Sequence, residues 1–145
     1  MLCCVALLLT FSGAAWAESA KIVKVLPHFL DLQGRNALNP SLFDRDAYQA
    51  ELRGKPEQRS ALRFDVQWKA RGYDDLTLRI EAKGGTARQP QWIKLEKPVK
   101  GGFFSRWSEL KIEGENYQRF GELTSWRATL WSGTNQVAEQ TSFLW

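Results

Sequence analysis

The chain has 145 residues, of which 43% are hydrophobic, 12% aromatic and 25% charged, with a formal net charge of +4. This composition excludes a disordered chain, a coiled coil and a polytopic membrane protein, and the length leaves room for one domain only. The mild positive charge is far from the concentrated basic stripe of a nucleic-acid-binding domain, so we expect no nucleic-acid partner.

The first seventeen residues have the pattern of a secretory signal peptide. Residues 2–11 form a continuous apolar run, and Ala15-Trp16-Ala17 is the small-x-small pattern that signal peptidase recognises. We therefore predict cleavage after Ala17 and a single exported domain, residues 18–145, with no membrane span. No Lys or Arg precedes Lys21, unlike most signal peptides, and an uncleaved membrane anchor is the alternative.

Both cysteines, Cys3 and Cys4, lie inside the predicted signal peptide. The exported domain therefore has no disulfide, no thiol nucleophile and no thiolate metal site. An exported domain without disulfides is common in the bacterial periplasm and less common among animal extracellular proteins. We predict a periplasmic or secreted protein, most simply of a bacterial envelope.

Alternating apolar and polar residues predict β-strands along most of the domain. The clearest segment is 60–69, where Leu62, Phe64 and Val66 alternate with polar residues, as in a half-buried antiparallel strand. Turn signals separate seven such segments: 21–32, 60–69, 76–82, 91–97, 104–113, 122–131 and 136–145. This pattern predicts an all-β sandwich of two sheets. The expected core is Leu62, Phe64, Val66, Leu78, Ile80, Leu110, Ile112, Trp126 and Leu130.

One short helix is predicted between the first and second strands, at residues 42–53. Ser41 with Asp44 three residues later resembles a capping box, and Gly54 marks the end of the helix. We expect the helix to cover one end of the sandwich. Its expected buried stripe is Phe43, Ala47, Tyr48 and Leu52.

The sequence LRFDVQW at residues 62–68, a turn and LTLRI at residues 76–80 resemble the second and third strands of a fibronectin type III or related immunoglobulin-like domain. In that superfamily a Trp often closes the second strand. The hairpin at residues 125–143 is similar to the sixth and seventh strands. The resemblance implies a seven-stranded antiparallel immunoglobulin-like sandwich used for adhesion, docking or spacing, with no catalytic residues to carry over.

His28 is the only histidine of the chain. It falls on the same strand face as Leu26 and Leu30, which favours a buried structural histidine. Asp31 falls on the opposite face, where it is a poor partner for a catalytic triad or a metal site. A Gly-x-Ser-x-Gly motif is also missing from the sequence.

The acidic clusters are better explained by local structure than by catalysis. Asp44 and Asp46 lie in the first turn of the predicted helix, where acidic side chains complement the helix dipole. Asp74 and Asp75 lie in a predicted turn, where Asp is a preferred residue. We therefore expect no enzymatic activity, no catalytic residues, no cofactor and no metal.

Tryptophan is the most suggestive residue type, with 7 in the chain. Trp68 and Trp126 fall on apolar strand faces and are expected in the core. Trp92, Trp107 and Trp131 fall on faces that carry charged residues, and they are the candidate binding residues. Exposed indoles beside polar groups serve both in stacking on sugar rings and at the centres of protein interfaces.

These observations predict an exported, non-catalytic β-sandwich domain that binds another envelope or extracellular protein, or another envelope component. A carbohydrate-binding module is the alternative, and it requires at least two of the three candidate tryptophans exposed on one surface. An enzyme is the third possibility. Its mark would be a cleft that joins His28 to a carboxylate.

Overall fold

The computed structural model describes residues 17–145, so the predicted signal peptide and both cysteines lie outside the described residues, apart from Ala17. Its body is a five-stranded antiparallel sheet, which confirms the all-β prediction. The elements are β1 (Ser19–Asp31), α1 (Leu42–Gly54), the 3-10 helix η1 (Pro56–Gln58), β2 (Arg59–Gly85), β3 (Pro90–Glu113), α2 (Gly114–Phe120), β4 (Ser125–Ser132) and β5 (Asn135–Thr141). Within these residues, neither α-helix is long and apolar enough to cross a membrane.

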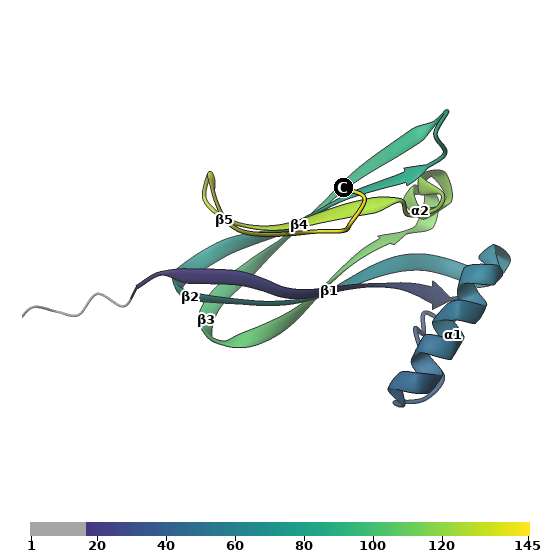
Figure 1. Ribbon diagram of the computed structural model, residues 1–145, viewed down its shortest axis with the longest axis horizontal. Coiled ribbons are helices and arrows are strands. Elements are labelled where there is room, and N and C mark those ends of the chain that lie inside the picture. Colours follow the sequence, from purple (N-terminus) through teal and green to yellow (C-terminus); the bar gives the residue numbers. More distant parts are fainter. Residues whose placement is uncertain (1–16) are drawn as a thin grey trace, which may run out of the picture.

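The two longest strands each carry two of the predicted strands. β2 contains segments 60–69 and 76–82, and β3 contains segments 91–97 and 104–113. β2 and β3 pair with each other along their length, with register shifts between Trp68 and Asp75 of β2. Both strands fold over at this bend (Figure 1). The structure therefore has five strands where the alternation predicted seven, because pairing continues through the bend.

A glycine makes the bend possible. A Cβ atom at Gly101 of β3 would collide with the carbonyl oxygen of Tyr73 on β2, so no larger residue allows the two backbones to approach this closely. The turn predicted between segments 60–69 and 76–82 is thus a bend within a strand pair.

The bend divides the sheet into two halves that lie over one another (Figure 1). In the β1 half, residues 59–71 of β2 lie between β1 and residues 102–113 of β3. In the β4 half, residues 75–85 of β2 lie between residues 90–100 of β3 and β4, and β5 pairs with β4. Each half has an inner face, directed toward the other half, and an outer face.

The core lies between the two inner faces. Eight of the nine predicted core residues are buried, and Trp126, at the end of β4, is partly buried. Trp68 is buried as predicted, and its indole Nε1 donates a hydrogen bond to the hydroxyl of Ser108 (3.0 Å). Phe64 of the β1 half and Leu78 of the β4 half belong to the same cluster, so one core supports both halves.

α1 occupies the predicted place, and its N-cap Ser41 accepts a hydrogen bond from the backbone N–H of Asp44 (3.4 Å). The predicted buried stripe is wrong in part: Leu52 is buried and Tyr48 partly buried, but Ala47 is exposed and Phe43 is 82% exposed. The reason is that α1 turns Gln49, rather than Phe43, toward β1.

Gln49 of α1 satisfies the free edge of β1. Its side-chain amide accepts from the backbone N–H of Phe29 (2.8 Å) and donates to the carbonyl of the same residue (2.9 Å). Unpaired backbone groups on an edge strand invite pairing with other chains, and a polar helix residue removes that risk here. Pro27, two residues earlier on the same edge, has no N–H to leave unpaired.

Asp31 holds the loop between β1 and α1. Its carboxylate accepts hydrogen bonds from the Tyr48 hydroxyl (2.7 Å), the Arg35 guanidinium (2.8 Å) and the backbone N–H groups of Gln33 and Arg35 (both 2.9 Å). Burial raises the pKa of Asp31, but these hydrogen bonds outweigh burial and lower the pKa to about 2. The carboxylate therefore stays ionised and fixes the loop.

A second helix, α2, was not predicted. It precedes β4, which begins at Ser125 rather than at residue 122, and its last residue, Phe120, is buried against Gly84 of β2. β5 ends at Thr141, so the last predicted strand is shorter than expected.

Candidate functional site

The three candidate tryptophans are divided between the two halves. Trp92 is paired with Lys83 of β2, and Trp131 with Thr77 of β2, so both lie on the outer face of the β4 half. Trp107 is paired with Gln67, in the β1 half. The partners of Trp92 and Trp131 are six positions apart on β2, which places the two indoles about 20 Å apart along the strand. The structure thus unites two of the three candidates on one face, at opposite ends.

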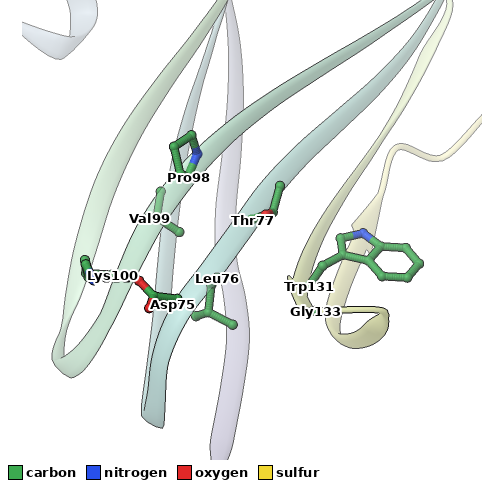
Figure 2. A pocket seen from close by; sticks show the side chains of 8 residues that line it. All are labelled: Asp75, Leu76, Thr77, Pro98, Val99, Lys100, Trp131 and Gly133. Atoms are coloured by element: carbon green, nitrogen blue, oxygen red, sulfur yellow. Dashed lines mark hydrogen bonds and ion pairs between the residues drawn. The ribbon is translucent and has the colours of Figure 1, made fainter.

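A shallow hollow of about 380 Å³ lies at the Trp131 end of this face. Thr77 and Pro98 line it, together with Lys100 and Asp75, whose side chains form an ion pair (2.5 Å). Figure 2 shows Trp131 across β2 from Pro98, with its indole directed away from the hollow. The ring therefore borders the hollow without forming its floor.

The indole of Trp131 is held in place by its neighbours. Its Nε1 donates a hydrogen bond to the hydroxyl of Thr129 (2.8 Å), and the guanidinium of Arg79 lies 4.5 Å from the ring centroid. Arg79 is itself fixed by an ion pair with Glu96 (2.7 Å). One face of the ring is thus covered by a cation and is not free to stack on a ligand.

The other end of the face carries an aromatic pair that we call the Trp92 cluster: Trp92, Trp145, Lys83 and Arg127. The two rings meet edge to face, with centroids 5.6 Å apart and an interplanar angle of 85°. Lys83 lies 5.4 Å from the ring of Trp92, and Arg127 lies 5.3 Å from the ring of Trp145. Trp92 is 60% exposed and Trp145 is 40% exposed.

Trp145 was missed as a site residue in the sequence. The alternation predicts that it lies in the last strand and assigns it no binding role. In the structure, β5 ends at Thr141 and the following residues form a turn. A hydrogen bond from the N–H of Trp145 to the carbonyl of Ser142 (3.3 Å) closes this turn. No local pattern signals this contact, because it depends on where the chain goes after its last strand.

Between the two ends, ion pairs cover the outer face of the β4 half. Arg79 meets Glu96 (2.7 Å), and Arg127 meets Glu81 (2.7 Å). Both contacts join residues directly opposite each other on neighbouring strands, where opposite charges stabilise a sheet. The face combines charge-balanced strands with aromatic groups at both ends.

His28 is buried, as predicted, and donates a hydrogen bond from Nδ1 to Oδ2 of Asp65 (2.7 Å) on the neighbouring strand. Arg63 donates to the same carboxylate (3.0 Å). Burial raises the pKa of Asp65, but the bonds from His28 and Arg63 outweigh it, and the net shift is downward. The pair ties β1 to β2. Asp65 could not be identified as the partner of His28 from the sequence, because the register between two strands cannot be predicted from the sequence of either strand.

A cleft of about 560 Å³ beside β1 and α1 brings His28 together with Asp46 and Glu122. This is the juxtaposition that would mark an enzyme. Both carboxylates are already paired, however: Asp46 with Arg45 (2.9 Å) and Glu122 with Arg59 (2.7 Å).

Among the described residues, no nucleophilic side chain is hydrogen-bonded to His28. Within residues 17–145, the one hydrogen bond that His28 makes goes to Asp65, so no serine or threonine hydroxyl is placed on the imidazole. In the same part of the chain, no three His, Cys, Asp or Glu side chains gather as a metal site requires. The hydrogen bond between His28 and Asp65 therefore has the geometry of a contact that holds β1 against β2.

No family model and no curated protein matches the chain. Among solved structures, it is similar to a crystal structure from Akkermansia muciniphila, with a TM-score of 0.53 and 14% sequence identity, over 91% of this chain and 73% of that chain. At this identity the likeness concerns the fold alone.

Proposed function

We propose that this chain is an exported, non-catalytic domain that binds another protein of the cell envelope through the outer face of the β4 half. The observation that carries the proposal is the Trp92 cluster, an exposed pair of indoles with a cation beside each ring. Trp and Arg dominate the binding energy of protein interfaces, because they bury a large area and still satisfy hydrogen bonds at the rim.

The surroundings of the cluster support a protein partner. Phe143 and Leu144, in the segment that carries Trp145, are also exposed, and they extend the apolar surface. Contiguous exposed apolar groups bordered by charges are a common feature of protein contact sites. The ion pair between Arg127 and Glu81 supplies such a polar border.

A glycan is the second candidate, because Trp92 and Trp131 share one face. Two features make it the weaker one. A sugar platform needs ring faces that are open and roughly coplanar, whereas Trp92 and Trp145 meet at 85°. Trp131 is covered on one side by Arg79.

The remaining parts of the proposal concern fold type and location. Two facing halves around one core, with a β4–β5 hairpin at the end of the chain, support an immunoglobulin-like sandwich with merged strands. The apolar run at residues 2–11, and the position of both cysteines before residue 17, support a periplasmic or secreted location.

The test compares recovery of partners from the solubilised envelope by the wild-type chain and two variants. Trp92→Ala removes the most exposed indole of the cluster. Phe43→Ala removes an aromatic side chain from α1 that is even more exposed, at 82% against 60%, and serves as the control. We expect one protein to be recovered with the wild type and with Phe43→Ala, and its affinity to fall at least about tenfold in Trp92→Ala.

Equal recovery by all three chains would contradict the proposal. A glycan panel run in parallel separates the second candidate. Saturable quenching of tryptophan emission by a glycan, abolished in Trp92→Ala and retained in Phe43→Ala, would instead identify a carbohydrate-binding module.

A further inference from the structure

The outer face of the β1 half contains an unusual pair of charges near the bend. Lys21 of β1 and Lys69 of β2 stand directly opposite each other in the strand register, and both are exposed. Like charges at directly opposed positions destabilise a sheet. A stable fold keeps such a pair either with a nearby counter-charge or at the cost of some stability.

More cations surround this pair. Lys24 is paired with Gln67, which is paired in turn with Trp107, so these three side chains share the outer face. Arg71 follows Lys69 on the same side of β2 and is paired with Ser19. We call this surface the basic face; its residues are Lys21, Lys24, Lys69, Arg71, Phe103 and Trp107.

No acidic side chain balances the lysines of the basic face. Across residues 17–145, no carboxylate lies within ion-pair distance of Lys21, Lys24 or Lys69. Asp65, which lies on the same side of β2, is already bound by His28 and Arg63 at the other end of the strand. Glu18 lies beside Gly72 at the bend but forms no ion pair with these three lysines, so the bend end of this half carries an excess of positive charge.

Exposed aromatic side chains accompany the cations. Phe103 is 63% exposed, Phe104 80% and Trp107 53%. The guanidinium of Arg71 lies 5.3 Å from the ring of Phe103, and a small hollow of about 230 Å³ between Lys69, Arg71 and Phe103 shows that these side chains border one another. Exposed phenylalanines at the tip of a bend add nothing to the core.

Basic residues interleaved with Trp and Phe are suited to the interface of an anionic membrane. Lys and Arg contact the phosphate groups of the lipid headgroups, while aromatic rings settle at headgroup level. A nucleic-acid partner would offer phosphates too, but the predicted export of the chain removes it from nucleic acid.

The chain enters the domain at this same end, because Ser19 is paired with Arg71. Seven residues, 12–18, separate the apolar run at residues 2–11 from β1. Seven extended residues span at most about 25 Å. Where the apolar run is retained as a membrane anchor, the alternative to its cleavage, Ser19 at the bend end of the basic face lies within that distance of the lipid surface.

We propose that the basic face docks on the surface of a membrane that contains anionic phospholipids. Its lysines and Arg71 contact headgroup phosphates. Phe103 and Trp107 enter the interface together with Phe104, whose ring centroid lies 6.1 Å from that of Phe103. This site lies on the half of the sheet opposite the Trp92 cluster, so a membrane-docked chain keeps the outer face of the β4 half open to a protein partner.

Co-sedimentation with vesicles tests the proposal, using the chain with the N-terminus that it carries when isolated from cells. The vesicles are pure phosphatidylcholine or phosphatidylcholine mixed with phosphatidylglycerol at 3:1. We expect binding to the anionic vesicles to exceed binding to the neutral ones at least about tenfold at low salt, and to decline as salt screens the charges. Because all variants carry the same N-terminus, its own affinity for lipid cancels in their comparison.

Two matched pairs of variants locate the site. Lys69→Glu is expected to lower binding to anionic vesicles at least about tenfold, whereas Lys94→Glu, the same charge change on the outer face of the β4 half, leaves binding within about twofold. Phe104→Ala lowers binding several-fold, and Phe43→Ala, at an equally exposed aromatic residue on α1, does not.

Equal binding to neutral and anionic vesicles would overturn the proposal. So would equal losses in Lys69→Glu and Lys94→Glu, which would reduce the effect to net charge. Binding to heparin with none to either vesicle would assign the basic face to an anionic polysaccharide and equally overturn it. Trp92→Ala binds anionic vesicles like the wild type, so failure of the proposed protein contact does not affect this result.

Discussion

The two halves of the sheet share β2 and β3, yet their outer faces balance charge differently. On the β4 half, Arg79 and Arg127 each meet a carboxylate at 2.7 Å. On the β1 half, Lys21 stands opposite Lys69, and within residues 17–145 neither lysine has an ion pair. β2 carries cations on its outer face in both halves, but register places Glu96 opposite Arg79 in the β4 half and Lys21 opposite Lys69 in the β1 half. Cross-strand register, more than composition, decides whether a strand face is neutral or cationic.

The β1 half is also divided along its length. Two acidic groups hold the α1 end, where Asp65 binds His28 and Arg63, and where Asp31 binds Tyr48 and Arg35. The bend end carries lysines and exposed phenylalanines, with Glu18 beside Gly72. One end of this half thus serves to anchor the chain and the other end presents charge to solvent.

The largest expected effects come from the core that both halves share. Phe64→Ala, in the β1 half, is expected to lower the free energy of unfolding by about 3–5 kcal/mol, and Leu78→Ala, in the β4 half, by about 2–5 kcal/mol, because both side chains are fully buried. Urea denaturation should show a single transition in each variant. Two separated transitions in Leu78→Ala would show that the halves are independent units, and the comparison between two faces of one domain would fail.

Asp31→Asn tests the anchoring end of the β1 half. The substitution weakens hydrogen bonds to a buried carboxylate, and we expect it to cost about 2 kcal/mol at pH 7. Tyr48→Phe, which removes one of those bonds, serves as the milder comparison, at about 1 kcal/mol.

The pH dependence of Asp31 has a defined sign. Its pKa is lowered to about 2 in the folded chain, below the value near 4 of an unfolded aspartate. The stabilisation is therefore complete above about pH 4 and is lost as the pH falls toward 2. The difference in unfolding free energy between the wild type and Asp31→Asn should shrink over that window. A difference that stays constant from pH 7 to pH 2 would exclude the charged carboxylate as its source.

On the balanced face, a double-mutant cycle of Arg127→Gln and Glu81→Gln measures one ion pair. Both side chains are partly exposed, so we expect a favourable coupling of about 0.5 kcal/mol that diminishes in 1 M salt. A coupling near zero at low salt would show that the pairs on this face contribute nothing, and that its neutrality has no energetic consequence.

Strand faces and most of the core were predictable because alternation is a local property. Side chains alternate between the two faces of a strand, so Phe64 and Val66 lie on the same apolar face whichever strands pair with theirs. The merging of predicted strands was not predictable, since it depends on pairing between β2 and β3 through the bend. Trp126 has the predicted face, but its place at a strand end leaves it partly exposed.

The same limit applies to the sites. Candidate tryptophans could be chosen by their charged neighbours, but which of them share a face depends on register. The partnership of His28 with Asp65, the opposition of Lys21 to Lys69 and the contact of Trp92 with Trp145 all join residues far apart in the sequence. Phe43 was misplaced because helix periodicity favours apolar stripes, whereas α1 turns Gln49 inward to satisfy the edge of β1.

The most direct test of the two-face account is the sign of the stability change when one cation is neutralised in each half. At low salt, Arg79→Gln is expected to lower the free energy of unfolding by about 0.5–1 kcal/mol, because it breaks the pair with Glu96. Lys69→Gln is expected to raise it by about 0.3 kcal/mol, because it relieves repulsion from Lys21, and 1 M salt should erase the gain. Loss of stability in both variants would contradict the account, because it would mean that the charges of the β1 half are balanced as well.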